Sequence, residues 1–517
     1  MSTNELRHGT WWDRLRGIPL DKAMEGRFTR LFDAQPNQPY NEDDLRALAL
    51  AMTASPDVPP TPETSDPPDA EENSGVPAAY TYFGQFIDHD LTLDPTSSLR
   101  ERLNPQQLQD LVGFRTPRFD LDCLYGRGPD DQPYLYNGVR MQLGNPMAGN
   151  DRDPHAVDVP RGPNGRALIG DPRNDENRIV AQLQATMLRF HNAVVGTMPD
   201  ADFATIRNLV RWHYQWVVVN DFLPTLVNAA TVKDVFPHLA AGTTVAENPP
   251  VPGLPCNDGL PLMPVEFSVA AYRFGHSMIR PIYRLNESLS RRQIFSTSTD
   301  PAGDLGGMRP IPSDWAIDWQ FFLDIGDGAP DDPPEANDPI PRRPQNSYKI
   351  DTSLVNPLGL LPAVIASNPS SLAERNLLRG LTFELPTGQQ VARALGEQPL
   401  DDADIKIGKA TDDPAEQGPS ITEISINFAG HAPLWTYVLA EAWQTSWQAI
   451  AKPDNATPIR LGPVGGRIVA GTFASLLLGD RTSIVYAPDF APLDAFTQAD
   501  GTFGLADLIN AALGRKA

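Results

Sequence analysis

Residues 81–95, TYFGQFIDHDLTLDP, hold four polar side chains within six positions of otherwise apolar or aromatic sequence: Gln85, Asp88, His89 and Asp90. Burying so many polar groups is costly unless each finds a partner. At helical spacing, Gln85 and His89 share one face, Asp88 lies slightly to one side, and Asp90 points away. We therefore predict a helical segment that serves two different sites. The alternative is a solvated acidic turn with one incidental histidine.

The composition of the chain is that of a globular protein. Hydrophobic residues make up 41% and charged residues 21% of its 517 residues, which is enough to bury a sizeable core. With a formal net charge of -23, the surface should repel nucleic acid and anionic lipid headgroups. The amino terminus lacks the apolar stretch of a secretory signal, and no apolar run approaches the roughly 18 residues of a membrane span. We predict a soluble protein without nucleic-acid partners, either cytoplasmic or exported without an amino-terminal signal.

Two long segments carry apolar residues at helical spacing, residues 177–195 (NRIVAQLQATMLRFHNAVV) and 433–451 (PLWTYVLAEAWQTSWQAIA). The 52 prolines gather in acidic clusters near residues 55, 247 and 326, and such segments read as surface loops because proline ends helices and strands. We predict a mainly α protein with long proline-rich loops and little β-structure. Residues 1–79 would form an amino-terminal arm with a proline- and acid-rich loop, and residues 80–517 one large domain. The sequence does not indicate the oligomeric state.

Hard oxygen ligands recur at two-residue steps in the segment 116–126, TPRFDLDCLYG. They are the side chains of Thr116, Asp120 and Asp122, with the backbone carbonyl of Arg118. Such oxygens suit calcium. The spacing is not that of the twelve-residue helix-loop-helix calcium motif, so a solvated acidic strand is the alternative. The calcium interpretation gains weight if a further carboxylate joins the group.

Three further segments carry polar pairs at helical spacing. In GDPRNDENRIVAQLQ (170–184), Arg173 and Glu176 come at the start of the predicted long helix, where they could also be ordinary end-of-helix charges. In AAYRFGHSMIRPIYRL (270–285), Arg273 would share a helical face with His276 and could meet an anionic group beside it. A lone histidine in such a place is usually a core residue with its hydrogen bonds satisfied. In LAERNLLRGLTFELPTG (372–388), Asn376 and Arg379 are likewise three apart and could face one site.

Taken in this order, the five segments resemble the animal-type haem peroxidases of the peroxidase-cyclooxygenase superfamily, including their bacterial members. The resemblance covers roughly residues 80–480 and includes the later segment GRIVAGTFASLLLGDR. It implies a single helical haem-peroxidase domain that binds haem b. It also implies an enzyme that reduces hydrogen peroxide and oxidises small donors, such as halide, thiocyanate or phenolic compounds, through a ferryl intermediate. The physiological donor cannot be predicted from linear motifs.

The resemblance assigns a role to each polar pair. His276 would ligate the haem iron through one ring nitrogen and donate its other N–H to the side-chain oxygen of Asn376. His89 would take a proton from peroxide and return it to the departing oxygen, while Arg173 stabilises the developing negative charge. Gln85 would hold a water or halide. The remaining cofactor-binding residues would be Arg273 and Arg379.

Calcium and covalent haem attachment also follow from the resemblance. The calcium ligands would be Asp90, Thr116, the carbonyl of Arg118, Asp120 and Asp122, so that the ion clamps the turn that holds His89. In family members, the carboxylates at the positions of Asp88 and Glu176 form esters with haem methyl groups. A third, sulfonium link needs methionine after the glutamate, and this sequence has Asn177 there. We predict two esters at most.

Three other functions are possible in principle. Fatty-acid dioxygenases of the same superfamily need a tyrosine three residues before the proximal histidine, where this chain has Arg273, with Tyr272 one position off. A non-catalytic adhesion relative is less favoured, because neither RGD nor KGD occurs and all the inferred catalytic residues are present. A metal-dependent hydrolase would use His89 or His191 but lacks an HExxH spacing.

The remaining histidines and the cysteines carry no predicted chemistry. We interpret His191, His213 and His431 as structural histidines. The two cysteines, Cys123 and Cys256, are far apart and suggest neither a disulfide framework nor a thiolate zinc site.

Overall fold

The structure is a computed structural model that describes residues 28–55, 71–93, 99, 113, 115–237, 261–295, 303–326, 344–448 and 458–515, apart from residues 364, 367, 412 and 414. The predicted proline-rich loops near residues 55, 247 and 326 lie almost wholly outside the described residues, as does Cys256. No described helix is long and apolar enough to cross a membrane.

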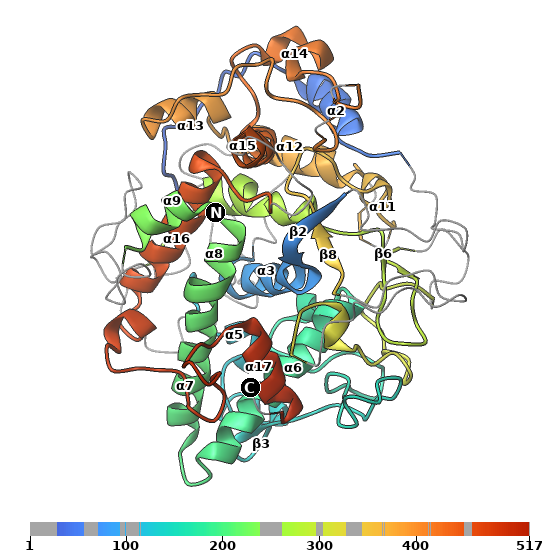
Figure 1. Cartoon of the computed structure of the whole chain (residues 1–517), viewed down its shortest axis with the longest axis vertical. Coiled ribbons are helices and arrows are strands. Elements are labelled where there is room, and N and C mark those ends of the chain that lie inside the picture. The colour runs from blue at the N-terminus through green and yellow to red at the C-terminus, as the bar shows by residue number, and fades with distance from the viewer. Residues whose placement is uncertain are drawn as a thin grey trace, which may run out of the picture.

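Helices dominate the described residues (Figure 1). The α-helices are α2 (Glu42–Ala51), α3 (Ala78–Leu91), α5 (Asp122–Tyr125), α6 (Arg178–Thr197), α7 (Phe203–Val217), α8 (Leu223–Leu226), α9 (Ala229–Val235), α11 (Asn356–Gly359), α12 (Leu372–Thr382), α13 (Gly388–Ala394), α14 (Ile421–Ile424), α15 (Leu434–Gln448), α16 (Pro463–Gly479) and α17 (Leu505–Leu513). Short 3-10 segments are η2 (Pro133–Leu135), η3 (Pro172–Asp175), η6 (Ala271–His276), η8 (Trp319–Phe321), η9 (Ile426–Phe428) and η10 (Ile484–Tyr486), and η4 (Val218–Phe222) and η5 (Glu266–Ala270) are π-helical.

The described strands are short and form four separate two-stranded sheets. They are β1 (Phe28–Thr29), β2 (Glu72–Pro77), β3 (Tyr136–Asn137), β4 (Arg140–Met141), β5 (Met263–Pro264), β6 (Ile282–Tyr283), β7 (Arg292–Gln293) and β8 (Asn346–Tyr348). Strand β1 pairs in parallel with β5, and the pairs β2–β8, β3–β4 and β6–β7 are antiparallel. The mainly α fold predicted from the sequence is confirmed.

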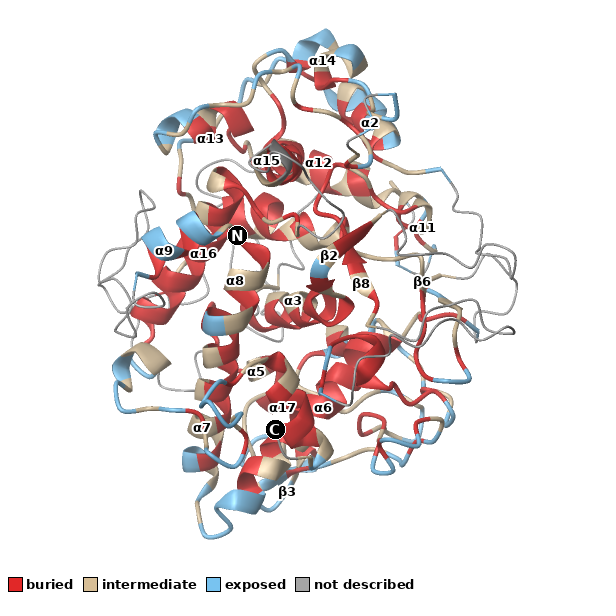
Figure 2. Cartoon of the chain, in the orientation of Figure 1, coloured by how far each residue is buried: buried red, intermediate tan, exposed pale blue. Residues whose placement is uncertain are grey.

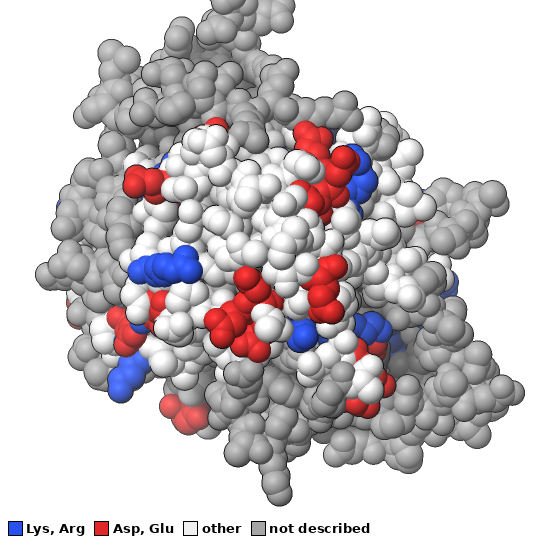
Figure 3. Space-filling view, turned by 90° about the horizontal axis from the view of Figure 1, so that it is seen from above, with Lys and Arg blue, Asp and Glu red and all other residues white. Residues whose placement is uncertain are grey.

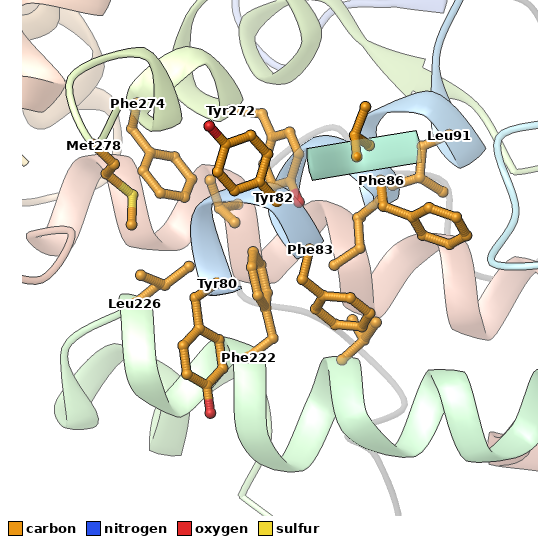
Figure 4. Close-up of a cluster of buried hydrophobic side chains, with 14 of the residues drawn as sticks. Tyr80, Tyr82, Phe83, Phe86, Leu91, Phe222, Leu226, Tyr272, Phe274 and Met278 are labelled. Atoms are coloured by element: carbon orange, nitrogen blue, oxygen red, sulfur yellow. The ribbon is translucent and has the colours of Figure 1, made fainter. Parts of the chain in front are cut away.

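The core surrounds α3, which lies at the centre of the molecule in Figure 1 and packs against α6, η3 and η6. Helices α3, α6 and α16 are mostly buried (Figure 2). Aromatic side chains on α3 meet rings from later segments. Phe83 lies edge-on to Phe222 at 5.8 Å between ring centroids (Figure 4), and edge-on to Tyr214 at 6.0 Å. Each such side chain stabilises the fold by roughly 1.5–3 kcal/mol through burial, so α3 is held firmly.

The described part of the predicted arm packs onto the rest of the chain. Helix α2 contacts α12, β1 pairs with β5, and β2 pairs with β8. A boundary at residue 79 stays a prediction. On the face seen in Figure 3, acidic side chains form several separate groups and outnumber the basic ones, in keeping with the net charge of -23.

Candidate functional site

Helix α3 presents Gln85 and His89 on one face, and Glu176 lies against both. The amide nitrogen of Gln85 donates to Oε1 of Glu176 at 2.7 Å, and Nε2 of His89 is 3.3 Å from the same oxygen. Burial around the Glu176 carboxylate favours its neutral form, but contact with the His89 ring and the charge of Arg173 outweigh this and lower its pKa. The structure thus brings together three of the predicted site residues.

The other nitrogen of His89 is bonded to Asn174, a residue without a role predicted from the sequence. Nδ1 of His89 lies 2.6 Å from Oδ1 of Asn174, and Nδ2 of Asn174 donates to Oε1 of Gln184 at 2.8 Å. All three side chains are buried. The available signal was the position of Asn174 directly after Arg173, but an asparagine next to a candidate arginine does not indicate by itself which residue it contacts.

We predicted that Arg173 lies at the start of the long helix. The structure places it before that helix, in η3. Helix α6 begins later because the side chain of Asn177 accepts a hydrogen bond from the amide of Ile179 and caps it. The Arg173 guanidinium donates to both oxygens of Asp171, at 2.8 Å from Nη2 to Oδ2, and to the backbone carbonyl of His89 at 2.9 Å. Arg173 is therefore tied directly to the end of α3.

Asp171 joins two arginines. Burial favours its neutral form, but the charge and hydrogen bonds of Arg173, with the charge of Arg115, lower its pKa to about 2. Nε of Arg115 lies 2.7 Å from Asp171 Oδ2, and its Nη1 is 3.3 Å from Oδ1 of Asp122. Arg115 therefore connects the Arg173 turn to the acidic segment that follows Thr116.

Three carboxylates gather at the end of α3, where Asp90, Asp120 and Asp122 place one oxygen each within 4.8 Å of one another. Asp90 is fully buried, and among the described residues neither of its oxygens has a hydrogen-bond partner of normal geometry. Burial, followed by the charges of the other two carboxylates, raises the pKa of Asp90 well above its usual value. Three carboxylate anions this close to one another repel each other, and a hard cation bound between them would compensate their charge.

The loop that carries two of these carboxylates is shaped closely. Thr116 donates to Oδ2 of Asp120 at 2.7 Å, and the Arg118 guanidinium donates to Oδ1 of Asp480 at 2.9 Å. Leu121 adopts the left-handed conformation with φ 58°, a backbone state that L-residues rarely occupy. A Cβ on Gly170 would lie 2.5 Å from the carbonyl oxygen of Cys123, so only glycine lets this loop contact the Arg173 turn.

On the other side of α3, the π-helical η5 leads into the 3-10 segment η6, in which Arg273 and His276 lie one above the other because 3-10 side chains repeat every three residues. The Arg273 guanidinium donates to Oδ1 of Asn376 at 3.0 Å, and Nδ2 of Asn376 lies 2.8 Å from Nδ1 of His276. We predicted that the amide oxygen would face the histidine. The structure has the nitrogen there, because Arg273 can only donate and takes the oxygen.

His276 is neutral in this setting. Burial, with the nearby charge of Arg273, lowers its pKa to about 3. A neutral imidazole is the form that binds metals. Arg379 lies half-buried on α12, three residues after Asn376.

Tyr272 joins this segment to α3 (Figure 4). Its hydroxyl donates to the carbonyl of Gly84 at 3.3 Å, and its ring stacks on Phe267 at 4.6 Å. Arg273, one position later, is directed to Asn376 instead. The residue three positions before His276 is therefore a cation engaged in the His276 hydrogen-bond network, and the nearby tyrosine is occupied elsewhere.

His191 and His213, predicted to be structural histidines, are bonded to protein groups. His191 bonds to the hydroxyl of Tyr125 at 2.9 Å and the carbonyl of Val139 at 2.8 Å. His213 bonds to the Leu209 carbonyl at 2.7 Å and accepts from the amide of Leu493 at 2.9 Å. Both ring nitrogens of each are used. Asp88, on α3, accepts a hydrogen bond from the Thr92 hydroxyl at 3.0 Å.

The chain is similar to known proteins in part of its sequence and in its fold. The model of the family "Animal haem peroxidase" matches residues 115–302. Among solved structures, peroxidase A from Dictyostelium discoideum is 16% identical, with 89% of this chain and 88% of that chain covered and a TM-score of 0.55. A fatty acid alpha-dioxygenase from Oryza sativa is 14% identical (89% and 81% covered, TM-score 0.51), and one from Arabidopsis thaliana 14% (95% and 77%, TM-score 0.55).

No curated protein sequence matches the chain. At these identities the likeness to solved structures shows a shared fold, and that fold occurs in both a peroxidase and fatty acid dioxygenases. The choice between these activities depends on residues of the site and not on the fold.

Proposed function

We propose that this chain is a haem-dependent peroxidase of the peroxidase-cyclooxygenase superfamily that reduces hydrogen peroxide and oxidises small donors such as halide, thiocyanate or phenolic compounds. The match of the animal haem peroxidase family model to residues 115–302 supports this proposal. The observation that supports this most directly is a pair of histidines, each held through Nδ1 by an asparagine: His89 by Asn174 and His276 by Asn376. They lie on α3 and η6, which pack against each other.

Haem b would supply a redox-active iron that binds peroxide. His276 would hold the iron through Nε2, which requires the ring proton on Nδ1 and the oxygen of Asn376 facing it. A half-turn of the Asn376 amide exchanges its nitrogen and oxygen with little other movement. This turn needs Arg273 to leave the amide oxygen, and an anionic group of the cofactor is a suitable new partner.

His89 would act as the general base for peroxide. Its Nε2 lies 3.3 Å from Oε1 of Glu176, the oxygen that also accepts a hydrogen bond from Gln85. From there it would take one peroxide proton and return it to the oxygen that leaves as water. Arg173 already holds the end of α3 through the His89 carbonyl, and its charge would stabilise the negative charge that develops as the O–O bond breaks. Gln85 would position a water or a halide.

Glu176 and Asp88 are the proposed sites of ester links to the cofactor. The Glu176 side chain contacts His89 and is still 43% exposed. Its carboxylate is therefore accessible to a bound cofactor. With Asn177 in the next position, a sulfonium link has no methionine, and two esters are the maximum. Extraction with acidified solvent after peroxide treatment tests this, because release of all haem unmodified would exclude ester formation.

Calcium is the proposed ion of the acidic group Asp90, Asp120 and Asp122, with the Thr116 side chain and the Arg118 carbonyl. The unpartnered oxygens of Asp90 support this proposal. Because Asp90 directly follows His89, we expect loss of the ion to loosen His89 before it unfolds the protein.

The experiment that tests the proposed function is an absorption spectrum of haem-reconstituted protein before and after one equivalent of peroxide. We expect the wild type to bind haem and to change its spectrum rapidly. His276→Ala should lose haem, and His89→Ala should keep haem but react about 10²–10⁴-fold more slowly, the range for loss of a general base. A wild type that binds no haem, or reacts as slowly as His89→Ala, would contradict the proposal.

A fatty-acid dioxygenase activity is the second candidate, because two of the similar structures are fatty acid alpha-dioxygenases. Arg273 at the position of the required tyrosine argues against it, and Tyr272 is bonded to Gly84. Oxygen consumption with palmitic acid distinguishes the two activities. Uptake that needs fatty acid and survives removal of peroxide would favour the dioxygenase. A non-catalytic adhesion role is excluded if the wild type turns over peroxide.

A further inference from the structure

We propose that Asn174 is a positioning residue that places the ring proton of His89 on Nδ1 and so keeps Nε2 free to accept a proton. This inference rests on the proposed peroxidase function, in which His89 is the base. In this proposal Asn174 acts only through its contact with His89.

The orientation of the Asn174 amide determines which atom donates and which accepts in its hydrogen bond with His89. Oδ1 of Asn174 lies 2.6 Å from Nδ1 of His89, and an amide oxygen can only accept a hydrogen bond. Nδ1 must therefore carry the proton, and in the neutral ring the lone pair is then on Nε2. Asn174 is fully buried and His89 is 3% exposed, so water does not compete for this bond.

Gln184 on α6 holds the asparagine in that orientation. Nδ2 of Asn174 donates to Oε1 of Gln184 at 2.8 Å, while among the described residues the Gln184 amide nitrogen has no hydrogen-bond partner. The bonds run in one direction, from the His89 ring to Asn174 and on to Gln184. Because η3 and α6 are packed together, the asparagine is anchored to a rigid helix.

The groups around the far side of the ring cannot perform this function. Nε2 of His89 faces Glu176 at 3.3 Å, and a carboxylate there attracts a proton to Nε2. Without an acceptor at Nδ1, the Nε2–H form would therefore predominate and the base would be blocked. The Asn174 oxygen opposes this by stabilising the Nδ1–H form. We expect its loss to slow base-dependent steps by about 10–100-fold, less than the loss of the whole base.

Cyanide binding to the ferric haem protein tests this without donor turnover. Hydrogen cyanide must lose its proton when it binds iron, so its association rate reports the free lone pair of the base. Asn174→Leu, which has nearly the same volume but no acceptor, should bind cyanide about 10–100-fold more slowly than the wild type. Asn174→Asp keeps an acceptor at Nδ1, and Gln184 can turn its free amide nitrogen toward the second oxygen. We expect a rate within about threefold of the wild type.

Asn73→Leu is the matched control for the loss of a buried asparagine. Asn73 is 1% exposed, and both its amide atoms are bonded to the backbone of Ile459. This variant should lose stability but keep the wild-type cyanide rate. A merely structural role for Asn174 would make Asn174→Leu behave in the same way.

Each outcome bears on the inference. A wild-type cyanide rate for Asn174→Leu would overturn the inference. An Asn174→Asp rate as slow as that of the leucine variant would also overturn it, because it would mean that an oxygen acceptor at Nδ1 is not what the wild-type asparagine supplies. If the leucine variant does not fold, the aspartate variant decides alone. If the wild type binds no haem or binds cyanide no faster than His89→Ala, the proposed function fails and this inference falls with it. Rapid wild-type binding with unaffected Asn174 variants would overturn the inference only.

Discussion

His89 and His276 are each bonded through Nδ1 to the side-chain amide of an asparagine, but the two amides face their rings in opposite directions. At His89 the amide oxygen faces Nδ1 and the amide nitrogen is bonded to Gln184. At His276 the amide nitrogen faces Nδ1, because Arg273 occupies the oxygen. The third residue therefore decides which ring nitrogen carries the proton. A histidine–asparagine pair can therefore hold either a general base or a histidine that becomes an iron ligand once the amide turns.

The two settings also differ in how complete they are. The His276 network consists of protein groups bonded to one another. Helix α3, by contrast, continues from His89 into Asp90, whose buried oxygens have no hydrogen-bond partner among the described residues. The His89 region should therefore depend on a bound cation for its order, and the His276 region should not.

The largest effect on stability should come from Asn376→Leu, which breaks the His276 network at its centre. Nη1 of Arg273 and Nδ1 of His276, both part-buried, lose the amide group to which they are bonded, so the free energy of unfolding should fall by about 2–4 kcal/mol. Urea denaturation measures this. Asn356→Leu is the control, because the hydrogen bond of that half-buried side chain to the Ala54 carbonyl is long, at 3.4 Å. A loss below about 1 kcal/mol would mean that the network is not a structural unit.

Asp90→Asn should separate the two regions through calcium. Without the ion, the variant should be more stable than the wild type by about 1–2 kcal/mol, because it lacks an uncompensated buried charge. With calcium the order should reverse. Thermal unfolding in millimolar calcium and in a chelator gives both values. Equal calcium-induced shifts in melting temperature for the two proteins would refute a calcium ligand role for Asp90.

Arg273→Met should change the His276 side toward the arrangement at His89. With the cation gone, the Asn376 oxygen is free to turn toward Nδ1, at a cost in stability of about 1 kcal/mol for the lost hydrogen bond. Nitrogen-15 NMR of histidine-labelled, haem-free protein reports the tautomer. The wild type should show the proton of His276 on Nε2, and the variant should gain the Nδ1–H form. A wild type already in the Nδ1–H form would contradict the comparison.

The smallest effect provides a reference that is independent of the ion. Glu441 on α15 is a buried carboxylate that, unlike Asp90, accepts hydrogen bonds, from the amides of Val464 and Gly465 at 2.9–3.1 Å. Burial raises its pKa to about 7. The folded protein therefore holds this proton more tightly than the unfolded chain, and the associated stability is lost as the pH rises through 7.

Glu441→Gln should remove that loss. Between pH 6 and pH 8, the wild type should lose on the order of 1 kcal/mol relative to the variant. Urea denaturation at both pH values provides the measurement. The difference should be the same with and without calcium, whereas a calcium-dependent difference would mean that Glu441 is coupled to the acidic group at α3.

The sequence by itself determined the helical fold and the identity of most candidate residues. Periodic apolar residues indicated α6 and α15, and the polar positions in 81–95 correctly separated Gln85 and His89 from Asp90, since a helix has a fixed angular step. Arg173 was misplaced by a few residues, because a capping asparagine moves a helix start without changing the apolar pattern.

Only the tertiary structure decided how the polar groups are paired. Several residues of the site belong to no sequence motif: Asn174, Gln184, Asp171 and Arg115. The role of each depends on a side chain that the folded chain brings into contact with it. The orientation of the Asn376 amide is of the same kind. The NH2 group and the oxygen of the amide have nearly the same shape, so the asparagine can turn either one toward His276. The position of Arg273 determines which one it is, and the sequence around Asn376 does not reveal it.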